Sequence, residues 1–134
     1  MNRFIEAQER DYKIALNEVQ SGKKLTHWIW YIFPQMRGLG RSFYAHLYGI
    51  INIEEAQEYL QDKILGERLR EITNALLEHY DKTAVDIFGY LDAMKVKSCM
   101  TLFDAISPND IFDKVLDRFY EGKRCESTIR ILNS

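Results

Sequence analysis

The chain has 134 residues, of which 46% are hydrophobic and 28% are charged, and this length predicts one domain over residues 1–134. Its net charge is −2 and its pI is near 5.9, so no global field draws it to nucleic acid or anionic lipid, and we expect no nucleic-acid partner. No apolar run approaches the roughly 20 residues that span a bilayer, which excludes a membrane span.

The first segment repeats apolar residues at three- and four-residue multiples, which predicts a helix that ends at Gly22. Residues 23–35, which carry both tryptophans, allow two interpretations. Their aromatic and β-branched content favours a strand, whereas Thr26 as a cap and Pro34 as a terminator favour a short helix. We favour the helix, on which the two tryptophans diverge by about 200°, so that one of them belongs to the core.

Capping residues mark the next helices. Ser42 is predicted to cap a helix through about residue 51, and residues 52–55 have the spacing of a capping box. Asp62 is predicted to cap a long helix with the clearest amphipathic pattern in the chain. Its apolar stripe is Leu65, Leu69, Ile72, Leu76 and Tyr80.

A short helix from Thr83 to Gly89 precedes the most apolar segment, residues 92–106. This segment leaves only a narrow polar strip, which predicts a helix at the centre of the domain. Residues 107–110 give another start signal, and Ser127 is predicted to cap a last short helix. No hairpin dipeptide occurs. We therefore expect an all-α fold, a single compact orthogonal array of about seven or eight helices.

Polar groups recur inside the two most apolar segments. His27 is the best-placed titratable residue and can act as acid, base or anion donor, although an imidazole bound to backbone and packed on Trp30 is the simpler interpretation. Trp30 can stack on a planar ligand. The glycine-framed residues 38–42 resemble a small phosphate cradle, in which Arg41 would clamp an anion and Ser42 opens a helix. A plain tight turn accounts for the same glycines.

The polar strip of the most apolar segment consists of Lys95, Lys97, Ser98 and Thr101. A lysine on a nearly buried helix is costly unless it is paired. We therefore expect its amine to reach the surface or to pair with Asp92 or Asp104. The alternative is that the strip lines a polar pocket together with His27, Gln35 and Arg41.

One motif resembles the signature of a small, mainly bacterial family known as domain of unknown function 1810. The motif reads His27-Trp28-x-Trp30-x-x-Phe33-Pro34-Gln35-x-x-Gly38-Leu39-Gly40-x-Ser42, and the likeness continues through Lys95-x-x-Ser98-x-Met100-Thr101-Leu102-Phe103. It covers nearly the whole chain. The resemblance implies a mainly helical single domain and carries no established activity.

These observations predict a domain that binds a small anionic ligand, a nucleotide or an ADP-ribose-like compound. The expected ligand-binding residues are Trp30, Gln35, Arg41, Ser42, Lys95, Ser98 and Thr101. One alternative is a hydrolase or transferase that uses His27 for proton transfer. Another is a non-enzymatic interaction module that uses the aromatic segment.

Two cysteines outside any Cys-x-x-Cys motif fit a reducing compartment, so we expect a cytoplasmic protein. Three isolated histidines without acid or cysteine neighbours at ligand spacing predict no metal site. We also expect no cofactor, and either a monomer or a weak homodimer.

Overall fold

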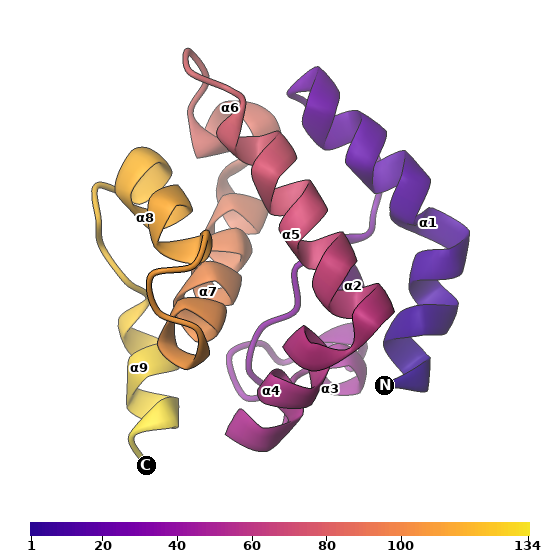
Figure 1. The fold of residues 1–134 in the computed structure, drawn as a ribbon, viewed down its shortest axis with the longest axis vertical. Coiled ribbons are helices and arrows are strands. Elements are labelled where there is room, and N and C mark those ends of the chain that lie inside the picture. The colour runs from indigo at the N-terminus through magenta and orange to yellow at the C-terminus, as the bar shows by residue number, and fades with distance from the viewer.

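The helix α7 (Tyr90–Ile106) is the packing centre of the protein. It contacts α2, α4, α6, α8 and α9 in the computed structural model, which describes residues 1–134 (Figure 1). The other helices are α1 (Asn2–Ser21), α2 (Ile29–Ile32), α3 (Phe43–Tyr48), α4 (Ile53–Gln61), α5 (Lys63–Leu77), α6 (Ala84–Phe88), α8 (Phe112–Tyr120) and α9 (Glu126–Leu132). These nine helices and the absence of strands confirm the all-α prediction.

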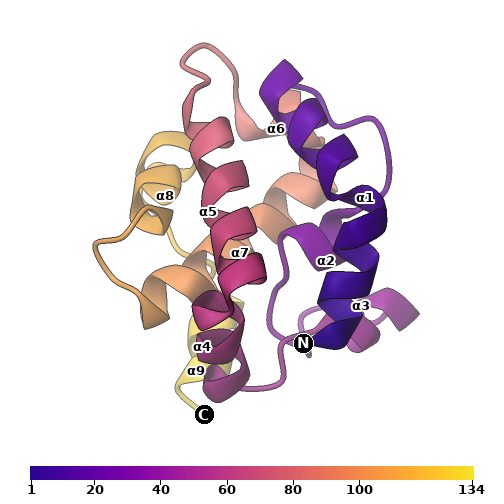
Figure 2. The same cartoon turned by 45° about the vertical axis from the view of Figure 1, so that its right-hand side comes forward.

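The apolar residues of every long helix meet in one core cluster of 32 buried residues. On α7 the buried side chains include small polar ones, Ser98 and Thr101, among large apolar ones. The helices α1 and α5 lie side by side (Figure 2), where the Tyr12 hydroxyl donates to the Arg68 carbonyl at 3.0 Å. None of the helices is both long enough and apolar enough to cross a membrane.

The predicted caps explain four of the nine helix starts. Ser42 Oγ accepts from the Ala45 amide at 3.1 Å, and Asn52 Oδ1 accepts from the Glu55 amide at 2.8 Å. Asp62 caps α5, and Thr83 forms a reciprocal capping box at the start of α6. These bonds satisfy amides that a helix start leaves without partners.

The first helix ends where predicted. Gly22 has φ 83°, a left-handed conformation in which its amide donates to Val19 O at 3.0 Å. Only glycine takes this conformation without strain. A Cβ at this position would also lie 2.7 Å from Lys82 Cε. The turn therefore sends the chain back across α1 toward the aromatic segment.

Several boundaries differ from the predictions. The helix α5 ends at Leu77, so Tyr80 lies beyond it and is 84% exposed instead of continuing the buried stripe. Thr26 does not cap α2, because its hydroxyl donates to Glu18 and Trp28 precedes the helix. The helix capped by Ser42 ends before the predicted residue 51.

The last two helix starts are also shifted. The start signal at 107–110 does not begin α8, because Asp110 pairs with Arg70 at 2.8 Å and accepts from the Ser107 hydroxyl. The helix begins instead at Phe112. Likewise α9 begins at Glu126, so Ser127 lies inside its first turn. In both places the side chain that was expected to cap a helix makes another contact or lies within the helix.

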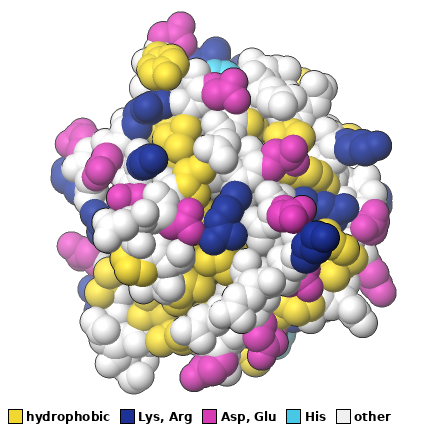
Figure 3. All heavy atoms as spheres, in the orientation of Figure 1, with side chains coloured by type: hydrophobic (Ala, Val, Ile, Leu, Met, Phe, Trp, Pro, Cys, Tyr) yellow, Lys and Arg dark blue, Asp and Glu magenta, His cyan; other side chains and the backbone are white.

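Charges of both signs are interspersed over the face drawn in Figure 3, and apolar side chains lie between them. That face carries no extended region of one sign. The distribution agrees with the small net charge of −2. Any attraction for an anion must therefore come from a local arrangement of side chains.

Candidate functional site

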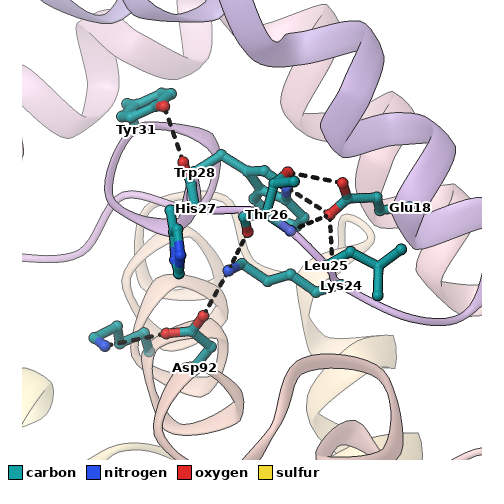
Figure 4. A network of polar contacts seen from close by, with 9 residues as sticks. Glu18, Lys24, Leu25, Thr26, His27, Trp28, Tyr31 and Asp92 are labelled. Carbon is teal, nitrogen blue, oxygen red and sulfur yellow. Dashed lines mark hydrogen bonds and ion pairs between the residues drawn. The ribbon is translucent and has the colours of Figure 1, made fainter.

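The segment between α1 and α2 is fixed by the buried carboxylate of Glu18. It accepts hydrogen bonds from the amides of Leu25 (2.8 Å) and Thr26 (3.0 Å), the Thr26 hydroxyl (2.7 Å) and Trp28 Nε1 (2.9 Å) (Figure 4). Burial raises the pKa of Glu18, but these bonds outweigh it and lower the pKa to about 2. The bonded residues on either side hold His27 in place.

Asp92 on α7 binds two ammonium groups. Its Oδ2 lies 2.9 Å from Lys24 Nζ, and its Oδ1 lies 3.1 Å from Lys95 Nζ. Lys24 Nζ also donates to Thr26 O at 2.6 Å. Burial raises the pKa of Asp92, but the hydrogen bonds from both lysines outweigh it and hold the pKa below its usual value. The ionised carboxylate therefore ties the loop before α2 to α7 (Figure 4).

Each lysine also faces a tryptophan. Lys24 Nζ lies 4.9 Å from a Trp28 ring centroid, and Lys95 Nζ lies 4.6 Å from a Trp30 ring centroid. Trp28 is the tryptophan of the core, while Trp30 is half-buried. The Lys24 side chain is only 8% exposed and that of Lys95 is 24% exposed. An incoming ligand would therefore meet Lys95 and Trp30.

The opposite wall is built around the Tyr31 hydroxyl. It bonds to the Asp11 carboxylate, lies 3.3 Å from His27 O and accepts from Arg10 Nη2 at 3.4 Å. Burial, together with the Asp11 bond, raises the pKa of Tyr31 to about 12. The phenol therefore keeps its proton near neutral pH. Arg10 Nε also pairs with Asp11 at 3.2 Å.

These groups line one cavity of about 570 Å³, a size typical of small-molecule sites. Its lining residues are Arg10, Asp11, Lys24, His27, Trp28, Ile29, Trp30, Tyr31, Tyr44, Tyr48, Asp92 and Lys95. Three cations face two carboxylates, so the lining carries a charge of +1 with His27 counted as neutral. Tyr44 and Tyr48 bring a further aromatic wall from α3. A locally positive, aromatic-walled cavity thus exists in a chain whose net charge is −2.

The structure brings some of the predicted site residues together. His27, Trp30 and Lys95 all line the cavity. Trp30 and Lys95 also line a second hollow, of about 290 Å³, together with Gln35 and Ser98. Five of the eight predicted site residues therefore lie along two adjoining concavities.

The other three lie elsewhere. Arg41 is exposed and lines neither concavity. Ser42 caps α3 through its bond with the Ala45 amide. Thr101 is buried, and its hydroxyl accepts from the Cys125 amide at 2.9 Å. Leu39 and Gly40 of the glycine-framed turn therefore line the second hollow, whereas Arg41 lies outside both concavities.

Four ionic residues of the cavity were not among the predicted ligand-binding residues. Lys24 lies at the start of the segment 23–35 without any sequence signal of its own, and Asp92 was expected only as a partner for a lysine of the polar strip. Arg10 and Asp11 lie on α1 and gave no sequence signal. The structure contains no group of three or more His, Cys, Asp or Glu side chains arranged to hold a metal ion.

A family model described as "Protein of unknown function (DUF1810)" matches residues 1–132. Among solved structures, the chain is similar to the conserved hypothetical protein Rv1873 from Mycobacterium tuberculosis, at 40% sequence identity and a TM-score of 0.97. That similarity covers 99% of this chain and 96% of the other chain. No curated protein matches the sequence.

Proposed function

Because the chain belongs to the DUF1810 family, whose description assigns no activity, we propose a function from the cavity: a cytoplasmic domain that binds a small anionic ligand with a planar ring. A nucleotide or an ADP-ribose-like compound has this chemistry. The cytoplasmic assignment is supported by two free cysteines, which suit a reducing compartment.

The observation that carries the proposal is the pairing of Lys95 with Trp30. The ammonium and a ring centroid lie 4.6 Å apart on the wall shared by both concavities. A half-buried aromatic ring and a cation side by side suit a ligand that joins a planar group to a phosphate. The ammonium of Lys24 is largely buried and paired with Asp92, and it adds positive charge to the lining of the cavity.

Changing Lys95 to glutamine is expected to weaken the binding of adenosine monophosphate about fivefold. The variant removes the accessible ammonium but leaves the Lys24 and Arg10 charges in the cavity, so the loss corresponds to about 1 kcal/mol. Isothermal titration calorimetry measures the affinity, and a thermal shift gives an independent reading, because a ligand at about 100 times its dissociation constant stabilises a fold by about 2.7 kcal/mol.

Lys63→Gln is the matched control, because Lys63 is exposed at the start of α5 and has no ion pair. Ribose 5-phosphate, which lacks the planar ring, is expected to bind more weakly than adenosine monophosphate. Equal affinities of the Lys95 and Lys63 variants would contradict the assignment of the cavity. Absence of any shift with adenosine monophosphate and ADP-ribose at millimolar concentration would contradict the proposed function itself.

A second candidate function, hydrolysis or group transfer on such a ligand, is favoured by the position of His27. Its side chain is exposed and lines the cavity, and no hydrogen bond occupies its ring nitrogens. We expect His27→Ala to bind ADP-ribose yet to lose any turnover that the native protein shows by phosphorus NMR. Turnover that survives in this variant would remove His27 from the mechanism.

The third expectation, an aromatic interaction surface, has less support. Trp28, Ile29, Tyr31, Ile32 and Phe33 are all buried. A segment packed in this way offers no contiguous apolar patch to a partner. Trp28, Ile29 and Tyr31 instead line the cavity.

A further inference from the structure

We propose that the ligand site extends beyond the first cavity along α7 and takes an elongated ligand, one whose anionic groups lie at two separate places. This inference rests on the proposed function, since it names the shape and charge pattern of the ligand for the same site. Two further hollows support it: the first shares a wall with the cavity, and the second shares a wall with the first.

The first extension follows one stripe of α7. Leu91, Met94, Lys95 and Ser98 recur at three- and four-residue intervals and line the hollow of about 290 Å³. Trp30 and Lys95 are shared with the first cavity, so the two concavities share a wall. Leu91 is exposed there despite its apolar side chain. The stripe offers apolar area next to the Lys95 charge.

A third hollow, of about 530 Å³, continues from the second, with which it shares Met94, Cys125 and Ser127. Its cations are Lys97, Lys123, Arg124 and Arg130, and its only carboxylate is Glu126.

Two of these cations already have partners. Arg124 pairs with Asp104 at 3.1 Å, and Lys123 lies 3.7 Å from Glu121. Lys97 and Arg130 have no ion pair, and Arg130 donates only to the Ser127 hydroxyl. Their charges are therefore available to an anion that reaches this end of the groove.

The spacing of the charged ends sets the class of ligand. Lys95 of the first cavity and Lys97 of the third hollow are two positions apart on α7, so their side chains leave the helix about 200° apart, on opposite sides of a cylinder about 10 Å in diameter. Inorganic phosphate or a single phosphate ester cannot engage both ends. A dinucleotide-sized ligand such as ADP-ribose, with a ring at Trp30 and its far end toward Lys97, spans this length.

Cys125 provides a native reporter at the junction of the second and third hollows. It is half-buried, whereas Cys99, the other cysteine, is fully buried in the core. Burial raises the pKa of the Cys125 thiol, but hydrogen bonding by Ser98, whose Oγ lies 3.2 Å from Sγ, and by Thr128 outweighs it, so the pKa is lowered. Burial alone raises the pKa of Cys99. An alkylating reagent should therefore modify Cys125 selectively in the folded protein.

The test measures the rate at which iodoacetamide modifies Cys125, by mass spectrometry, without ligand, with adenosine monophosphate and with ADP-ribose. ADP-ribose is expected to slow the reaction about fivefold, while adenosine monophosphate raises the melting temperature but leaves the rate unchanged. The double change Lys97→Gln with Arg130→Gln is expected to weaken ADP-ribose binding about fivefold and to leave adenosine monophosphate binding unchanged. Lys63→Gln serves again as the control.

The outcomes separate the two proposals. Binding of ADP-ribose without protection of Cys125, or without any effect of the double change, overturns the extension but leaves the proposed function standing. Protection of Cys125 by adenosine monophosphate also overturns it, because a short ligand would then occupy the junction. If neither compound binds, both proposals fail. Cys99 stays unmodified throughout while the protein remains folded.

Discussion

Changing Glu18 to alanine is expected to lower the free energy of unfolding by about 3 kcal/mol. The carboxylate is buried and accepts hydrogen bonds from three residues of the loop before α2, among them the indole of Trp28. Its removal leaves the buried indole N–H of Trp28 without a partner and frees the loop, and a single unsatisfied buried donor costs about 1 to 3 kcal/mol. Urea denaturation followed by tryptophan fluorescence measures the loss.

Two further variants serve as controls for the loss of stability measured for Glu18→Ala. Glu6→Ala removes an exposed carboxylate from the same helix and should change stability by less than about 0.5 kcal/mol. Glu18→Gln keeps one acceptor oxygen and should lose about half as much as alanine does. A loss below about 1 kcal/mol for Glu18→Ala would show that the loop satisfies its donors elsewhere.

The same carboxylate predicts how stability depends on pH. The pKa of Glu18 is about 2 in the folded protein, against 4.5 for an ordinary glutamate. A carboxylate with a lowered folded-state pKa contributes stability above pH 4.5, and the contribution is lost as the pH falls from about 4.5 toward 2. The Glu18→Gln variant should therefore lose less stability across this range than the native protein does.

Changing Asp92 to asparagine is expected to strengthen anion binding about tenfold and to lower the free energy of unfolding by about 2 kcal/mol. The amide no longer neutralises Lys24 and Lys95, so the cavity gains one unit of positive charge close to the ligand. Stability falls because the ammonium of Lys24 is largely buried and loses its carboxylate. Calorimetric titration with adenosine monophosphate and urea denaturation measure the two effects.

The gain in affinity should shrink as salt is added, because the effect is electrostatic. Asp117→Asn makes the same change of charge at an exposed position on α8, away from the cavity, and should alter neither property. Weaker binding by the Asp92 variant would mean that the carboxylate itself contacts the ligand. Unchanged binding would mean that the anion does not bind near the two lysines.

Local sequence signals were sufficient for much of the helical framework. Ser42, Asn52, Asp62 and Thr83 each bond to amides two or three residues ahead, so their effect is readable within a few positions. The prediction that Tyr80 belongs to the buried stripe of α5 was wrong, because the periodicity of apolar residues does not show where a helix ends.

The candidate site was less accessible to this kind of reasoning. His27, Trp30 and Lys95 stood out because polar or ionisable groups interrupt apolar segments. Asp11 gave no such signal, since it reaches the cavity only through the packing of α1 against α2. Arg41 carried a plausible anion-binding pattern, but only Leu39 and Gly40 of its turn line the second hollow, and Arg41 itself lines neither concavity. Pairings across long stretches of chain depend on the tertiary fold and leave no spacing to detect.

The helix α7 belongs both to the core and to the candidate site, so a ligand bound to it should oppose the opening of the whole protein. One side of this helix lies in the core, and Asp92 and Lys95 on the same helix line the cavity. Amides in such a helix exchange their hydrogens with solvent only through large opening events. A ligand held by α7 should therefore slow exchange at amides far from itself, including those facing α8, and the whole α7 amide set becomes a reporter of occupancy.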